Sequence, residues 1–173
     1  KFELCFPVED AAETVLVPEL LPDVTPPLKG WEAAKCVVFI YRYHVLPHGV
    51  LPSFITRTHT LGGGKERWRS GVVLVDDGAE ALIKADYEAN TISVWVRGQF
   101  ADARRALLKV VRHHFDVIHS RIKDLNPTEH VTVPGHPTVT VPYLDALQDE
   151  RDRKVSYRVT IDGKRVDKSI SDL

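Results

Sequence analysis

The chain has 173 residues, enough for one domain, and its charges nearly cancel, with 23 Lys and Arg against 24 Asp and Glu. That balance argues against a protein whose main task is to grip nucleic acid. No apolar run approaches the ~20 residues needed to cross a bilayer, so we expect no membrane span. A hydrophobic core is expected, because a chain of this length buries roughly 70% of its unfolded surface.

Two strands are predicted near the start, over residues 2–6 and 14–17. No secretory signal is seen at the start. The chain begins with Lys rather than Met and enters a predicted strand almost at once, so we expect a piece of a longer protein. Cys5 and Cys36 both lie among apolar residues on predicted strands. Two cysteines make no disulfide framework, so buried thiols are favoured over a disulfide, and a cytoplasmic location is expected.

The next part of the chain predicts a strand, a corner and a helix. Residues 35–45 form a β-branched and aromatic run, which is typical of a central strand. A Pro-Gly corner follows at 47–49, and apolar residues at helical spacing predict a helix from about Gly49. The glycines at 62–64 then end this helix as a flexible loop.

Strands at about 68–75, 79–86 and 91–98 are separated by tight turns and predict an antiparallel meander. Trp68 is expected to anchor the sheet to a helix. A long helix follows over about 102–122, with Asp102 as its N-cap and an apolar stripe of Leu107, Val110, Val111, His114, Phe115, Ile118 and Ile122. Strands at 130–133 and 138–141, a short helix from Tyr143 to Arg151, and a hairpin at Asp162-Gly163 complete the chain.

These elements predict an α+β fold: an antiparallel β-sheet with a meander, flanked by one long and one or two shorter α-helices. No catalytic, cofactor-binding or metal site is expected in it. The Gly62-Gly63-Gly64-Lys65 run lacks the first glycine and the final Ser or Thr of a phosphate loop. His113, His114 and His119 share the long helix but lack the spacing of three or four that places ligands on one face.

The basic face of the long helix supports an alternative function. Five cationic side chains could meet phosphates, namely Arg104, Arg105, Lys109, Arg112 and Arg121. The alternative is therefore an α+β nucleic-acid-binding module that uses helix 102–122. A solvated face or a protein contact is favoured, because no aromatic residues alternate with these charges. An enzyme with an unrecognised site is a third possibility.

Several short segments, taken together, resemble the C-terminal half of the COR (C-terminal-of-Roc) domain of Roco proteins. In order, they are Phe2-Glu3-Leu4-Cys5-Phe6-Pro7, Val17-Pro18-Glu19-Leu20-Leu21-Pro22, Tyr41-Arg42-Tyr43, Leu46-Pro47-His48-Gly49, Phe54-Ile55-x-Arg57, Arg67-Trp68-Arg69-Ser70-Gly71-Val72, Ala85-Asp86, and Arg104-Arg105 with Phe115. Residues 1–150 would form this subdomain, and residues 151–173 a terminal hairpin or a linker to the next segment.

The resemblance implies a non-catalytic homodimerisation module that also packs on a Roc GTPase domain in the same chain. GTP or GDP and Mg²⁺ would be bound by Roc, so no cofactor is expected here. The N-terminal half of COR would be a further partner, and no nucleic acid is expected. The strand-to-helix corner, Val45, Leu46 and Pro47, would face Roc.

Two sets of residues are predicted to make these contacts. His114, Phe115 and Ile118 are assigned to the dimer contact, and Phe54 joins the corner residues on the Roc side. A plain core role stays open for Phe115, Ile118, Leu46 and Phe54. If Phe115 lies at the surface, Phe115→Asp should give a folded monomer.

Overall fold

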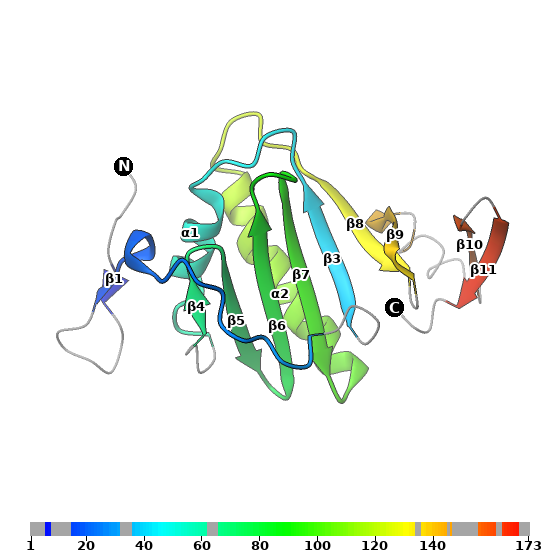
Figure 1. The fold of residues 1–173 in the computed structure, drawn as a ribbon, viewed down its shortest axis with the longest axis horizontal. Coiled ribbons are helices and arrows are strands. Elements are labelled where there is room, and N and C mark those ends of the chain that lie inside the picture. Colours follow the sequence, from blue (N-terminus) through cyan, green and yellow to red (C-terminus); the bar gives the residue numbers. More distant parts are fainter. Residues whose placement is uncertain are drawn as a thin grey trace.

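Seven antiparallel strands form the main sheet of this computed structural model, in the order β4-β5-β6-β7-β3-β8-β9 (Figure 1). The structure describes residues 6–7, 15–31, 36–61, 66–133, 136–144, 146, 156–161 and 164–169. In chain order the strands are β3 (Val37–Arg42), β4 (Arg67–Trp68), β5 (Gly71–Asp76), β6 (Ala79–Asp86), β7 (Thr91–Gly98), β8 (Thr128–Val133) and β9 (His136–Pro142). The expected α+β class with an antiparallel meander is confirmed.

Tight turns explain why β5, β6 and β7 pair in sequence order. Asp77 and Gly78 have φ angles of 39° and 79°, so they form the two-residue turn that joins Asp76 to Ala79. This left-handed geometry matches the natural twist of a hairpin. Along β7, Ile92, Val94 and Val96 are buried and alternate with more accessible residues, as the sequence pattern predicts.

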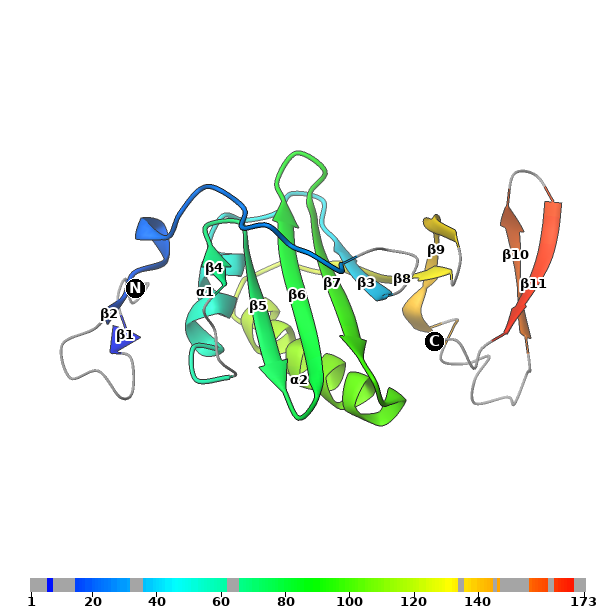
Figure 2. The same cartoon turned by 60° about the horizontal axis from the view of Figure 1, so that its bottom comes forward.

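Both helices, α1 (Val50–Arg57) and α2 (Ala101–His119), lie on one face of the sheet (Figures 1 and 2). The main core forms between them and the inward side chains of the strands, which include Phe39 and Tyr41 on β3. The expected N-cap of the long helix is wrong by two residues. Phe100 occupies the cap position and Asp102 lies in the first turn, where its charge still favours the helix dipole.

The segment that leads to Trp31 crosses the other face of the sheet, on the side away from α2 (Figure 2). This segment begins with the 3₁₀ helix η1 (Pro18–Leu20). Leu28 and Trp31 pack there against Trp68 and Leu82. Trp68 therefore does not anchor the sheet to a helix, as the sequence suggested, but fills the space beneath this segment.

The ends of the chain form two smaller pairs of strands. β1 (Phe6–Pro7) pairs with β2 (Val15–Leu16), and β10 (Ser156–Ile161) pairs with β11 (Lys164–Ser169). The second pair confirms the expected C-terminal hairpin, although its turn, like Cys5 and the glycines at 62–64, lies outside the described residues. Of the predicted helix from Tyr143 to Arg151, only Tyr143, Leu144 and Ala146 are described, and they are helical.

Candidate functional site

The corner between β3 and α1 is held in place by the turn between β6 and β7. The backbone N–H of Tyr43 donates to the carbonyl oxygen of Asn90 at 2.9 Å. The backbone N–H of Leu46 donates to Asn90 Oδ1, also at 2.9 Å. Asn90 has a φ of 53°, a left-handed conformation that Asn tolerates better than most residues. One turn residue therefore fixes both ends of a four-residue segment.

The predicted Roc-facing residues fall into two groups in the structure. Val45 is 64% exposed and Pro47 is partly exposed, so both are accessible on the corner. Leu46 and Phe54 are buried in the main core instead. The core role is therefore the one that the structure shows for Leu46 and Phe54, and the accessible surface of the corner is made by its remaining residues.

The predicted dimer residues also lie mainly in the core. Phe115 is fully buried, and Ile118 is only 4% exposed. The rings of Phe115 and Phe54 stack with centroids 4.2 Å apart and planes 10° apart. Of the dimer set, only His114 is partly accessible. The expectation that Phe115→Asp leaves a folded monomer is therefore corrected, since the substitution places a carboxylate in the core.

The C-terminal part of α2 is joined to the end of β3 by a polar contact within an aromatic cluster. Tyr43 Oη lies 2.9 Å from His119 Nε2. The ring of His119 also contacts Tyr41 edge-on, with centroids 5.2 Å apart. Burial raises the pKa of both tyrosines, so both phenols stay protonated at neutral pH. The sequence alone gave no reason to pair Tyr43 with His119, which are 76 positions apart.

The basic face of α2 is partly engaged in contacts within the chain. Arg112 donates to Glu129 Oε2 at 2.8 Å, and its guanidinium lies 4.4 Å from the ring centroid of Tyr143. Burial raises the pKa of Glu129, although the charge and hydrogen bond of Arg112 act in the opposite direction. Arg104 donates to the carbonyl oxygen of Gly98. Arg104 and Arg112, which were among the cations proposed for phosphate contact, therefore have protein partners.

The described residues offer packing surfaces rather than a reactive cluster. In that part of the chain, no three His, Cys, Asp or Glu side chains lie close enough together to hold a metal ion. No helix among the described residues has the length and apolar character needed to cross a membrane. The site is a packing arrangement, in which the corner, α1 and α2 contribute side chains to one aromatic core.

The fold and this site define an α+β domain in which the corner has an exposed outer side and is connected through the core to a long helix. Comparison with family models shows to which family this domain belongs. The chain belongs to the family described as C-terminal of Roc, COR-B domain, whose model matches residues 34–173. It is thus a COR-B domain of the Roco type. A comparison with curated proteins gave no match.

We expect the stability of the domain to fall as the pH drops from 7.5 to 5.5. Burial lowers the pKa of His119, and Asp116 only partly offsets this effect. The unfolded chain, with a His pKa of about 6.5, then binds more protons than the folded one, so stability is lost below that pH. Thermal unfolding followed by circular dichroism should show a smaller decrease in His119→Gln than in the wild type.

His44→Gln is the matched control, because His44 lies exposed on the corner. It should retain the wild-type decrease in melting temperature between pH 7.5 and 5.5. An identical decrease in all three proteins would show that the Tyr43–His119 contact contributes nothing to the pH dependence.

Proposed function

We propose that this COR-B domain is a non-catalytic dimerisation and interdomain-coupling module that regulates the Roc GTPase of a Roco protein. Membership of the family supports the pairing with Roc. The observation that carries the coupling is the stack of Phe54 on Phe115, because it joins the helix after the corner to the long helix. GTP or GDP and Mg²⁺ belong to Roc in this proposal, and the parent protein is cytoplasmic.

The corner acts as the receiving surface. Val45 and Pro47 contact Roc, while Leu46 and Phe54 lie behind them and transmit movement rather than touch Roc. α1 begins at Val50, immediately after the corner, so a shift of the corner moves α1. Because cores are close-packed, α1 cannot move without displacing Phe115. The free energy available to drive this shift cannot exceed the difference in contact energy between Roc and the corner in the two nucleotide states of Roc.

The dimer contact lies at the C-terminal part of α2. His114 is its accessible member, and Phe115 and Ile118 support it from the core. Residues three positions apart lie on one helix face, so Val117 extends the accessible surface beside His114. A two-fold contact would bring the same stripe of each copy face to face.

Sedimentation of the chain at several concentrations tests the dimer. The wild type should show a weak monomer–dimer equilibrium. Val117→Asp should remain folded and monomeric, because it places like charges opposite each other across the two-fold axis. Val75→Asp is the matched control: Val75 is 41% exposed on β5, on a different element, and this variant should dimerise like the wild type.

The same variants in the longer chain that includes Roc test the coupling. Val117→Asp should change the rate of GTP hydrolysis, whereas Val75→Asp should not. A wild-type chain that stays monomeric at every concentration contradicts the dimer. A monomeric Val117→Asp protein with unchanged GTP hydrolysis contradicts the regulatory role.

A further inference from the structure

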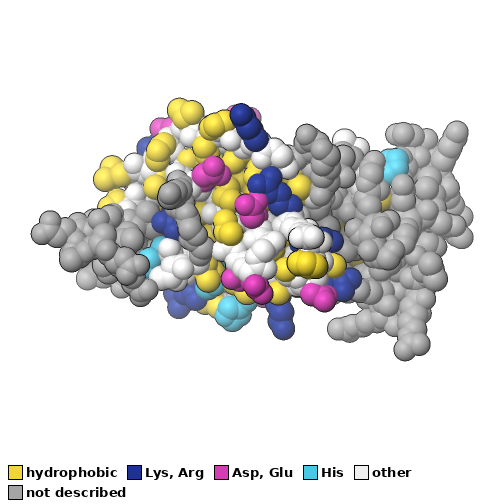
Figure 3. Space-filling model, turned by 90° about the horizontal axis from the view of Figure 1, so that it is seen from below, with side chains coloured by type: hydrophobic (Ala, Val, Ile, Leu, Met, Phe, Trp, Pro, Cys, Tyr) yellow, Lys and Arg dark blue, Asp and Glu magenta, His cyan; other side chains and the backbone are white. Residues whose placement is uncertain are grey.

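Basic side chains from three elements lie near the C-terminal end of α1. Arg57 ends α1, and its charge, with that of His113, acts on the neighbouring His114 of α2. Arg67 of β4 donates to the carbonyl oxygen of His59 at 2.8 Å, just after the same helix. Figure 3 shows Lys, Arg and His side chains, with a few acidic ones, along the side of the molecule that carries the helices.

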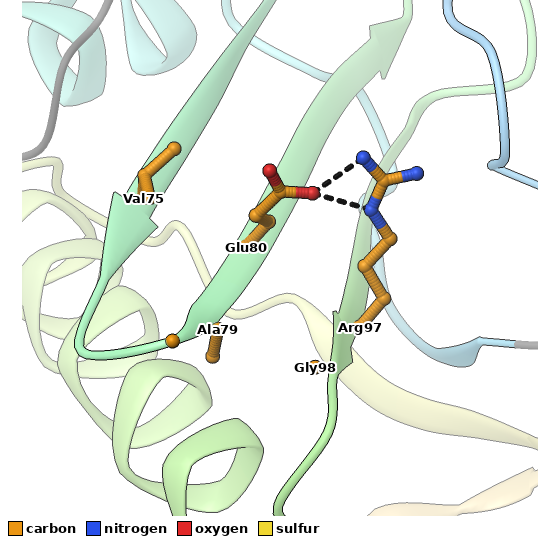
Figure 4. Close-up of a pocket in the computed structure, with 6 residues that line it drawn as sticks. Val75, Ala79, Glu80, Arg97 and Gly98 are labelled. Carbon is orange, nitrogen blue, oxygen red and sulfur yellow. Dashed lines mark hydrogen bonds and ion pairs between the residues drawn. The ribbon is translucent and has the colours of Figure 1, made fainter.

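Three side-chain nitrogens in this cluster have no hydrogen-bond partner among the residues that the structure describes. Arg57 Nε, Arg67 Nε and His114 Nδ1 are all buried without a partner. Three other arginines of the domain differ, because a carboxylate accompanies each of them, although Arg112 Nε itself also lacks a partner among the described residues. Arg97 is paired with Glu80 (Figure 4), as Arg69 is with Asp23 and Arg112 with Glu129. Among the described residues, no Asp or Glu plays this role for Arg57 or Arg67.

A buried donor without an acceptor costs free energy, and most such donors in native proteins are satisfied. The arrangement is therefore most stable when an acceptor reaches it. Arg57 is only partly buried, so its side chain can turn to meet a group that approaches from solvent. The groups that lack a partner belong to two guanidiniums and one imidazole. Together these groups favour binding of an oxyanion.

We propose that Arg57, Arg67, His113 and His114, here called the Arg57 surface, bind a carboxylate side chain from an acidic peptide segment of a partner protein. A guanidinium matches a carboxylate both in its single charge and in its two parallel hydrogen bonds. His114, whose ring lies edge-on to Phe54, supplies a further donor at the wall of the surface. The surface is distinct from the Val45 corner and shares only His114 with the proposed dimer contact, so its arginines can be tested apart from dimerisation.

Proton uptake accompanies this binding. Burial lowers the pKa of His114, and the two basic groups that face it, Arg57 on α1 and His113 on its own helix, lower it further. A carboxylate placed beside the ring counteracts these effects and raises the pKa of His114 in the complex. Affinity for an acidic peptide should therefore increase as the pH falls from 7.5 to 6.0.

Fluorescence anisotropy on the whole 173-residue chain tests the proposal. The probe is a fluorescein-labelled octapeptide of alternating Glu and Gly, and the same peptide with Gln in place of Glu should not bind. Arg57→Gln should weaken binding about tenfold, the size expected for one charge-assisted contact. Arg57→Lys should give an intermediate loss, because it retains the charge without the paired hydrogen bonds.

Arg121→Gln is the matched control, since it removes one exposed positive charge elsewhere on the helix side and should have little effect. Equal losses in Arg121→Gln and Arg57→Gln would show general attraction and overturn the proposal, as would unchanged binding in Arg57→Gln. Displacement of the peptide by an equal concentration of inorganic phosphate would assign the surface to phosphate instead. Arg57→Gln should sediment like the wild type, so this result is separable from that of the dimer test.

Discussion

Phe115→Asp is expected to abolish cooperative folding of the domain. The Phe115 ring is fully buried, stacks on Phe54 at 4.2 Å and contacts Tyr41 at 4.9 Å. Removing a buried Phe ring costs roughly 3–5 kcal/mol, and an unpaired buried carboxylate adds several more. The loss is comparable with the whole stability of a typical domain, about 5–15 kcal/mol. The far-ultraviolet circular dichroism melting curve should lose its transition.

Phe100→Asp is the matched control, because Phe100 is 65% exposed at the start of the same helix. It should melt within a few degrees of the wild type. Phe115→Leu should fold with a reduced melting temperature, since it keeps an apolar group in the core. A folded, monomeric Phe115→Asp protein would contradict the core position and return Phe115 to the dimer surface.

The elements that sequence reasoning predicted well are those set by local signals. The β5–β6 turn rests on Asp77-Gly78, a dipeptide that readily adopts left-handed φ angles. β7 alternates apolar and polar residues, and α2 repeats its apolar residues at helical spacing. Each signal lies within a few residues of the structure that it determines. Tertiary contacts therefore had little scope to override it.

The division between core and surface was harder to predict, because an apolar stripe has the same pattern whether it packs inside one copy or between two. Phe115 and Ile118 lie on the stripe of α2 that faces the sheet, which is apparent only when α1 and β3 are in place. Likewise, Trp68 faces the segment ending at Trp31 rather than a helix. The alternation of side chains along a strand predicts which residues lie on the same face of the sheet. It does not predict which part of the chain covers that face.

The contacts that connect the candidate site depend on residues far apart in sequence. Asn90 binds Leu46 across 44 positions, and Tyr43 meets His119 across 76. A tight turn was predicted between the strands at 79–86 and 91–98, but a turn prediction gives no direction to the Asn90 side chain. Unpaired atoms such as Arg57 Nε appear only after every possible acceptor has been placed. The Arg57 surface therefore had no sequence signal beyond its individual charges.

Gly71→Ala is expected to be the second most damaging substitution, although it adds a single methyl group. A Cβ atom at Gly71 would lie 2.2 Å from Trp68 Cζ2 and 2.6 Å from the backbone oxygen of Ile83. The backbone oxygen belongs to the paired strand β6 and cannot move without disturbing the sheet. Overpacking of this kind costs roughly 1–3 kcal/mol, or more where the neighbours cannot give way. Chemical denaturation should show this cost as a lower free energy of unfolding.

Gly78→Ala separates this clash from backbone strain. Gly78 has a φ of 79° but open space around it, so an added methyl group costs only the left-handed backbone energy, about 1–2 kcal/mol. Trp68→Leu should reduce the additional damage of Gly71→Ala, because it removes the ring that the methyl group would strike. Additive losses in the Trp68→Leu, Gly71→Ala double variant would show that the two residues are not in contact. A wild-type denaturation midpoint for Gly71→Ala would contradict the close packing of β4 on β5. It would also contradict the buried position of Trp68 beneath Leu28 and Trp31.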